Sequence, residues 1–174
     1  LGLESARQAV ASLKKGRRIE ELEQFALNDS MTGFYNRNAY DYFIYNEKNI
    51  KNYMVVTFDL NNLKMCNDNY GHSSGDAYII HSAHIIETTF DRFGKCYRIG
   101  GDEFCCLIPD AAEFQIERFI QKMQQDIAIL NNKNIIPTEV GIACGYALAT
   151  PDDADIEKVR ERADEMMSVS YTHL

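Results

Sequence analysis

The chain has 174 residues, 45% of them hydrophobic, which is enough for about one domain with a buried core. Its 18 Lys and Arg against 26 Asp and Glu give a formal net charge of −8, which excludes a general electrostatic grip on a nucleic-acid polymer. An anionic partner would therefore need a metal ion. No window approaches the roughly 18 consecutive apolar residues of a membrane span, and residues 1–18 are too charged for a secretory signal. We expect a soluble, cytoplasmic segment without direct membrane contact; whether the full protein carries a membrane anchor stays open.

The first 24 residues differ in composition from the rest. They hold five basic and four acidic residues, whereas the remainder is strongly acidic. Their apolar residues fall on heptad-like helical spacing, with a shift of face after Gly16: Leu3, Ala6, Val10, Leu13, Ile19, Leu22 and Phe25. This pattern fits either a helical stalk that pairs with another helix or an amphipathic helix packed on its own domain. We assign residues 1–28 to a helical signalling stalk.

The remaining elements are predicted from hydrophobic periodicity and turn residues. In chain order they are a helix from about Asn36, a buried strand at Tyr53–Leu60, a polar loop over Asn61–Ser74, a helix through Ile79–Phe90, a hairpin of Lys95–Ile99 and Phe104–Ile108, a helix at Ile116–Leu130, a strand at Val140–Ala149 and a last helix capped near Asp152 or Asp155. This order predicts an α+β fold, a ferredoxin-like sheet with a central β-hairpin, flanked by helices and preceded by the stalk.

Asp59 comes at the end of the predicted buried strand, and Asn67-Asp68 follow soon after. A carboxylate fixed at a strand end suits Mg²⁺, which demands rigid oxygen geometry and usually completes its shell with phosphate oxygens. The alternative is that Asp59 only caps a loop or helix and that Asn67-Asp68 is only a turn.

Two glycine-containing segments are the other candidates for a site. Gly71–Asp76 precedes a helix, so exposed N–H groups at the helix start offer a place for phosphate, although a simple loop with an N-cap also explains it. Gly100-Gly101-Asp102-Glu103 forms the predicted hairpin tip, where the backbone can approach a ligand while two acids reach a metal. A surface turn explains the glycines but not why two acids should lie beside the strand-end Asp59.

With these segments assembled, the chain resembles the GGDEF family of diguanylate cyclases over residues 29–167, which we assign as the GGDEF domain. The signature reads literally at Gly100–Phe104, and Asp29–Arg37 (DSMTGFYNR) matches the family's entry motif. Asp59–Asp68 and Gly71–Asp76 match in register. The resemblance implies an enzyme that condenses two GTP molecules into cyclic di-GMP and pyrophosphate, each monomer of a homodimer presenting one GTP.

The resemblance also implies a metal site and catalytic residues. Asp59, the Leu60 carbonyl and Asp102 would bind Mg²⁺ or Mn²⁺, with Glu103 assisting. Asp59, Asp102 and Glu103 are then the catalytic residues. Whether Asp102 also helps to deprotonate the attacking 3′-hydroxyl, in addition to binding the metal, stays open.

The implied substrate contacts lie in the same motifs. Asn67 and Asp76 match guanine-recognising positions, and the chemistry agrees, because an Asp accepts from guanine's N1–H and amine while an Asn donates to its acceptor edge. The resemblance also implies phosphate contacts from Lys64 and from the backbone of Asn62 and Leu63. At Gly100 and Gly101 it implies that the hairpin backbone closely approaches the nucleotide.

The sequence departs from the family pattern at three places. Asn61 replaces a frequent acid, which leaves Asp59 intact. The inhibitory Arg-x-x-Asp motif upstream of the signature is missing from Asp91–Lys95, so we expect no inhibition by cyclic di-GMP through that site. Residues 168–174 (SVSYTHL) stand where the family continues with Tyr-x-x-Lys and Gly-Arg-Asn, and we expect an atypical, truncated or foreign tail.

The main hypothesis is therefore the output domain of a bacterial signalling protein, fed by an upstream sensor domain absent from this chain. The alternative is a catalytically weak GTP-binding regulatory module. A nucleotidyl cyclase or palm polymerase acting on another nucleotide is disfavoured by Asn67 and Asp76.

Overall fold

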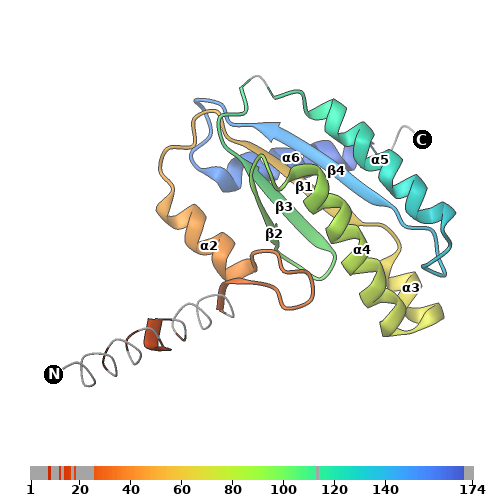
Figure 1. The fold of residues 1–174 in the computed structure, drawn as a ribbon. Coiled ribbons are helices and arrows are strands. Elements are labelled where there is room, and N and C mark those ends of the chain that lie inside the picture. Colours follow the sequence, from red (N-terminus) through yellow and green to blue (C-terminus); the bar gives the residue numbers. More distant parts are fainter. Residues whose placement is uncertain are drawn as a thin grey trace.

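The computed structural model describes residues 8, 12, 14–16, 18, 26–112 and 114–170, without the side chains of residues 168–170. The elements follow the chain in the order α2 (Arg37–Asn46), β1 (Met54–Leu60), α3 (Leu63–Tyr70), α4 (His72–Phe90), β2 (Lys95–Arg98), β3 (Glu103–Ile108), α5 (Ile116–Asn132), β4 (Ile142–Leu148) and α6 (Ile156–Ser170), as Figure 1 shows.

The four strands form one antiparallel sheet with the order β2-β3-β1-β4. The two central strands are β1 and β3, and β2–β3 is the predicted hairpin. Because β1 and β2 run parallel with β3 between them, the helices of the β1–β2 connection must cross over the sheet, which is the ferredoxin-like arrangement. The predicted fold class is confirmed.

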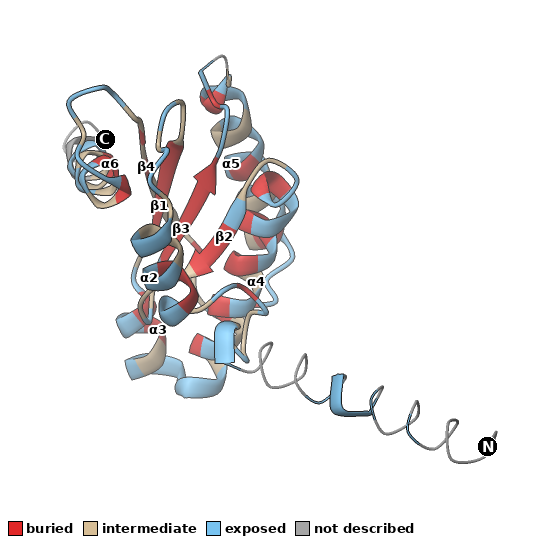
Figure 2. Ribbon diagram, turned by 90° about the vertical axis from the view of Figure 1, so that its left-hand side faces the viewer, coloured by how far each residue is buried: buried red, intermediate tan, exposed pale blue. Residues whose placement is uncertain are grey.

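Helices cover both faces of the sheet. Alternate residues of β1 point to opposite faces, so Val55 packs with α2 and α6 while Val56 and Phe58 pack with α4 and α5. Figure 2 shows the strands as a buried band between these two helical layers. Asp59 follows Phe58 and therefore lies on the α2/α6 face, at the end of its strand.

One predicted element is wrong. The segment Asn61–Ser74 is not a polar loop, because it contains α3 and the start of α4. The eight residues of α3 bury only Leu63 and Cys66, so their apolar signal was too short to reveal a helix. At the last helix the Lys158 N–H donates to the Asp155 carboxylate at 3.0 Å, which identifies Asp155 as the capping residue.

Among the described residues of the predicted stalk, residues 8, 12, 14–16, 18, 26 and 27 are helical, whereas Asn28 forms an isolated β-bridge with Tyr35. The heptad positions Leu3, Ala6, Val10 and Leu13 lie outside the described residues, so the stalk and its boundary at residue 28 stay a prediction. Residues 171–174 of the predicted tail also lie outside them. Within the described part of the chain, no helix is both long and apolar enough to cross a membrane.

Candidate functional site

Three acids meet at one end of the two central strands. Asp59 and Glu103 are direct partners in the antiparallel register of β1 and β3, and Asp102 precedes Glu103. Directly opposed residues of such strands have Cβ atoms about 4.5–5.5 Å apart, and like charges there repel. Burial raises the pKa of the Asp59 carboxyl, and the charges of Asp102, Glu103 and Asp164 raise it further. This end of the sheet therefore holds an excess of negative charge.

The hairpin tip is fixed to the end of β1 by backbone hydrogen bonds. The Leu60 N–H donates to the Asp102 carbonyl at 3.1 Å, and the N–H groups of Ile99 and Gly100 both donate to the Glu103 carbonyl, at 3.0 and 3.2 Å. A Cβ on Gly100 would lie 2.8 Å from a carboxylate oxygen of Glu103, so the missing side chain leaves room for that acid. Nothing lies within 4 Å of the corresponding position on Gly101, which is exposed.

Arg98 ties the hairpin tip to the turn that begins at Asp29. Its guanidinium donates to the Gly101 carbonyl at 2.8 Å and to the Asp29 carboxylate at 3.1 Å. Although burial opposes the change, hydrogen bonds from Thr32 and Arg98 lower the pKa of Asp29. The ion pair that Arg98 forms is with Asp29. The turn that begins at Asp29 thus helps to hold the hairpin tip in place through Arg98.

The start of α3 presents backbone N–H groups two residues after β1 ends. Asn62 adopts a left-handed conformation (φ 60°, ψ 18°) at the N-cap and makes no side-chain capping bond. The first N–H groups of a helix have no partner within the helix, so an uncapped start favours an anion. Lys64 is exposed, and within the part of the chain that the structure describes it has no ion pair. Figure 1 shows α3 at the same end of the sheet as the β2–β3 turn.

The guanine-recognition candidates lie where α3 packs against α4. A Cβ on Gly75 would lie 1.9 Å from Oδ1 of Asn67, so the Asn67 side chain fills the space that Gly75 leaves open. Asp76, the next residue of α4, is exposed. Gly71 takes a left-handed φ of 82° at the N-cap of α4. The sequence had suggested that Gly75 also lies in a loop, but Gly75 lies inside α4. Gly75 brings Asn67 close to Asp76 by allowing the two helices to approach.

We expect Gly75→Ala to weaken GTP binding about tenfold while the fold stays intact. The new methyl group must displace the terminal amide of Asn67, which can rotate away without moving the backbone of α3. The affinity for GTP, measured by calorimetry, and the melting temperature together check this. Asn67→Ala should lose a similar amount, and Gly75→Ala should then add nothing further. A Gly75→Ala variant with unchanged GTP affinity would contradict the packing argument.

The acidic end of the sheet fits a cation that arrives with its own oxygen ligands. In the described part of the chain, no group of three or more His, Cys, Asp or Glu side chains is placed to enclose a metal. Mg²⁺, however, is usually held by one or two carboxylates together with substrate phosphates and water. Asp59 and Glu103 are directly opposed, and no basic residue among those that the structure describes forms an ion pair with either, so they offer that kind of incomplete site.

Two features of the site were not found from the sequence. Tyr78 of α4 reads as a core residue, yet its hydroxyl lies 2.7 Å from the Asn61 carbonyl and accepts from the Gly141 N–H at 2.7 Å. It thereby joins the loop after β1 to the residue before β4. Asp164 of α6 lies close enough to influence Asp59. In the sequence, Tyr78 is marked only by a hydroxyl on an otherwise apolar helix face, and Asp164 only by its place among the charges of an amphipathic helix.

An antiparallel α+β sheet with acids at one end of its central strands defines a palm-type domain with a carboxylate site. The chain belongs to the GGDEF family: the family model described as "Diguanylate cyclase, GGDEF domain" matches residues 26–171. Enzymes of this family are diguanylate cyclases, nucleotidyltransferases that depend on a metal. The expected family and fold are confirmed.

Among curated relatives, "Diguanylate cyclase DgcN" of Escherichia coli K12 is 30% identical over 153 residues, which cover 84% of this chain and 37% of DgcN. The bifunctional diguanylate cyclase/phosphodiesterase MucR of Pseudomonas aeruginosa is 31% identical, over 79% of this chain and 22% of MucR. The cyclic di-GMP phosphodiesterase NbdA of the same organism is also 31% identical, over 70% and 17%. The chain therefore spans well under half the length of these relatives.

Among solved structures, the coiled coil and GGDEF domain of DgcB from Caulobacter crescentus, in complex with c-di-GMP, superposes with a TM-score of 0.79. The match has 22% identity and covers 97% of this chain and 94% of that one. The GGDEF domain of FimX from Pseudomonas aeruginosa matches with a TM-score of 0.68 and 18% identity over 82% and 92%. Identities this low establish the fold alone.

Proposed function

We propose that this domain condenses two molecules of GTP into cyclic di-GMP and pyrophosphate, with one GTP held by each monomer of a homodimer. The observation that carries the proposal is the pairing of Asp59 with Glu103 across β1 and β3, beside Asp102, in a member of the diguanylate cyclase family. A domain that only bound nucleotide would not need three acids at this end of its sheet.

Asp59, the Leu60 carbonyl and Asp102 would hold Mg²⁺ or Mn²⁺, with Glu103 beside them. Such a cation supplies charge stabilisation to the α-phosphate and to the attacking and leaving oxygens. The protein's own contribution is to keep the acids rigid, because Leu60 and Asp102 are joined by a backbone hydrogen bond. Asp102 is also the residue that we assign to accepting the 3′-hydroxyl proton.

Each GTP would lie along α3. The uncapped N–H groups near Asn62 and Leu63, together with Lys64, would bind the phosphates. Asn67 and Asp76 would bind guanine, with Asn67 set in place by its contact with Gly75. Gly100 and Gly101 would let the hairpin backbone approach the nucleotide. The orientation of the bound nucleotide follows from the order of these groups along the helix.

The relative named as a phosphodiesterase favours a second candidate function. NbdA carries a segment 31% identical to this chain, although NbdA is named as a cyclic di-GMP phosphodiesterase. A GGDEF domain of that kind would bind GTP and regulate a partner without turning GTP over. The intact trio of Asp59, Asp102 and Glu103 favours the enzyme.

The decisive experiment is incubation of the full-length dimeric protein with GTP and Mg²⁺, followed by chromatography of the products. We expect one cyclic di-GMP and two pyrophosphates per two GTP consumed, and no product from Asp102→Ala. Tight GTP binding without cyclic di-GMP from the wild-type dimer would support the regulatory module instead. Turnover of ATP in preference to GTP would contradict both.

We further propose that residues 1–28 form a stalk through which an upstream sensor domain sets the geometry of the dimer, in the cytoplasm. The support is the heptad-like spacing and the similarity to the solved structure of the coiled coil and GGDEF domain of DgcB. Asn36, the N-cap of α2, donates from its side-chain amide to the carbonyls of Ala26 at 2.8 Å and Asn28 at 3.3 Å. The end of the proposed stalk is thus bonded to the catalytic domain.

A further inference from the structure

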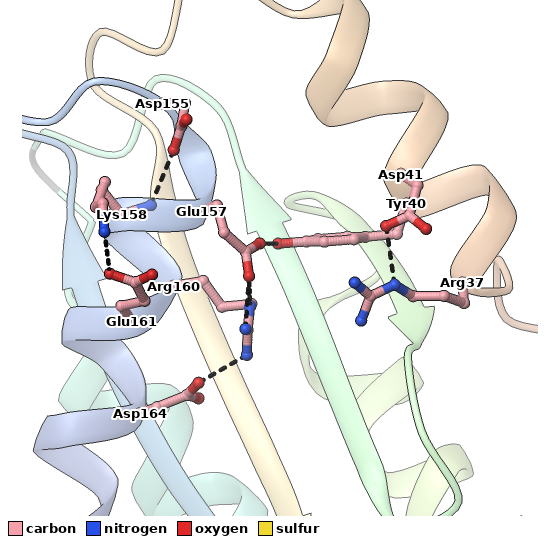
Figure 3. Close-up of polar contacts among 9 residues, drawn as sticks. All are labelled: Arg37, Tyr40, Asp41, Asp155, Glu157, Lys158, Arg160, Glu161 and Asp164. Carbon is pink, nitrogen blue, oxygen red and sulfur yellow. Dashed lines mark hydrogen bonds and ion pairs between the residues drawn. The ribbon is translucent and has the colours of Figure 1, made fainter.

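A chain of polar contacts joins α2 to α6 over the sheet face that carries Asp59 (Figure 3). The Tyr40 hydroxyl donates to Glu157 at 3.0 Å, and Glu157 accepts from two nitrogens of Arg160, at 2.6 and 3.0 Å. A third nitrogen, Nη1 of Arg160, donates to Oδ2 of Asp164 at 2.7 Å. The Arg160 side chain is only 21% exposed, so solvent screens these ion pairs less than ordinary surface pairs.

Helix α6 runs toward the acidic end of the sheet. Its Ala163 carbonyl lies over Gly145 of β4, which pairs with Thr57, whereas Ala143, two residues nearer the start of β4, pairs with Asp59. Since Met167 also contacts Gly145, the second half of α6 lies level with the last residues of β1. Asp164, next to Ala163, is therefore brought toward Asp59. The effect of Asp164 on the pKa of Asp59 agrees with this placement.

Arg160 is itself held in a fixed orientation. Two of its nitrogens bind one oxygen of Glu157, whose other oxygen accepts from Tyr40, a fully buried residue of α2. Because the guanidinium is planar, fixing two nitrogens also fixes the direction of the third. That third nitrogen donates to Oδ2 of Asp164. Oδ1 of Asp164 accepts no hydrogen bond from the part of the chain that the structure describes.

We propose that Arg160 is a positioning residue of the site, which holds the Asp164 carboxylate beside Asp59 so that its second oxygen accepts from water bound to the cation. The inference rests on the proposed function, because it assumes that a cation binds at Asp59 and Asp102. Partners that orient the shell around a metal commonly change its affinity by about 10- to 100-fold when removed. Asp164 would be a member of that outer shell.

A purely electrostatic role for Arg160 gives the opposite expectation. If Arg160 only reduced the negative potential near Asp59, its removal would strengthen cation binding, because a positive charge would be lost. If Arg160 positions Asp164, its removal weakens cation binding despite the more negative potential. The sign of the change in affinity therefore separates the two roles.

The test measures the dissociation constant of Mn²⁺ from the full-length protein in the presence of 3′-deoxy-GTP, which has no attacking hydroxyl. Electron paramagnetic resonance of free Mn²⁺ gives the constant without any turnover. We expect Asp164→Asn and Arg160→Gln each to weaken Mn²⁺ binding about tenfold. The double variant should bind no more weakly than Asp164→Asn alone, because both changes act through one carboxylate.

The matched control is Asp153→Asn. Asp153, which precedes α6, pairs with Arg162 of α6 at 2.5 Å. Its replacement should lower the melting temperature without changing the Mn²⁺ affinity. Unchanged or tighter Mn²⁺ binding by Arg160→Gln overturns the inference, and if that variant does not fold, unchanged binding by Asp164→Asn overturns it. Failure of the wild-type protein to bind Mn²⁺ with the nucleotide, or binding that survives Asp59→Asn, overturns the proposed function itself.

Discussion

Replacing Asp59 with Asn is expected to reduce cyclic di-GMP synthesis by about 10³-fold or more, because it removes a carboxylate from the site where charge must be stabilised in the transition state. The same change should raise the melting temperature by about 1–2 °C. Asp59 faces Glu103 directly across β1 and β3, and a like-charged pair in that position costs about 0.5 kcal/mol of folding free energy. Activity and stability should thus change in opposite directions.

The pH dependence of stability checks the same point. Burial and the neighbouring acids raise the pKa of Asp59, so the folded protein holds that proton more tightly than the unfolded chain does. This carboxyl therefore lowers the free energy of unfolding as the pH rises past its ordinary pKa of 3.8. Asp59→Asn should remove that part of the pH dependence, measured by urea unfolding between about pH 4 and pH 7.

Glu87→Gln is the control for Asp59→Asn. Glu87 lies exposed on α4, so its replacement should leave both synthesis and melting temperature unchanged. An Asp59→Asn variant that keeps a substantial share of cyclic di-GMP synthesis, or that melts below the wild type, would contradict our account of this end of the sheet.

Gly145→Ala is expected to destabilise the domain by about 2–3 kcal/mol and to lower its melting temperature by about 5–10 °C. A Cβ at this position would lie 2.0 Å from the Ala163 carbonyl oxygen and 2.7 Å from the backbone nitrogen of Met167. Both atoms belong to the backbone of α6, so no side-chain rotation relieves the contact. The helix would have to move off β4, and Asp164 with it.

Gly101→Ala is the matched control for stability, because nothing lies within 4 Å of the new methyl group. Thermal and urea unfolding of both variants measure the difference. A Gly145→Ala protein within about 0.5 kcal/mol of the wild type would show that α6 is not packed against β4 as described. In the expected case, Gly145→Ala should also lower the Mn²⁺ affinity, because α6 carries both Arg160 and Asp164.

The sequence predicted the parts of the fold whose signals are local. The strand Met54–Leu60 is a nearly continuous apolar run, and the hairpin is marked by two glycines between two apolar strands. Asp59 and Glu103 could therefore be expected at a common edge. Their direct pairing could not, because register depends on the long-range match of β1 with β3. Asn67 and Asp76 were expected to act together only because the chain resembles the GGDEF family at these positions.

Other parts depended on contacts that leave no pattern in the sequence. Helix α3 buries too few apolar residues to be recognised, although it carries Lys64 and Asn67. Gly75 suggests a flexible loop until its helical backbone and its contact with Asn67 are seen. Arg160 and Asp164 read as solvent-exposed charges of an amphipathic helix, because nothing local shows that α6 runs toward Asp59.

The alternation of side chains along β1 links the core to the chemistry. Val56 and Phe58 are buried on one face of the sheet. Asp59 lies on the other face, where Glu103 is its partner on the neighbouring strand β3. A slip of one residue between β1 and its neighbours would turn Asp59 into the layer beneath α4 and α5 and move Phe58 out of it. The hydrophobic packing of Phe58 therefore selects the one alignment in which the two acids meet, and a misregistered chain would lose its stability and its site together.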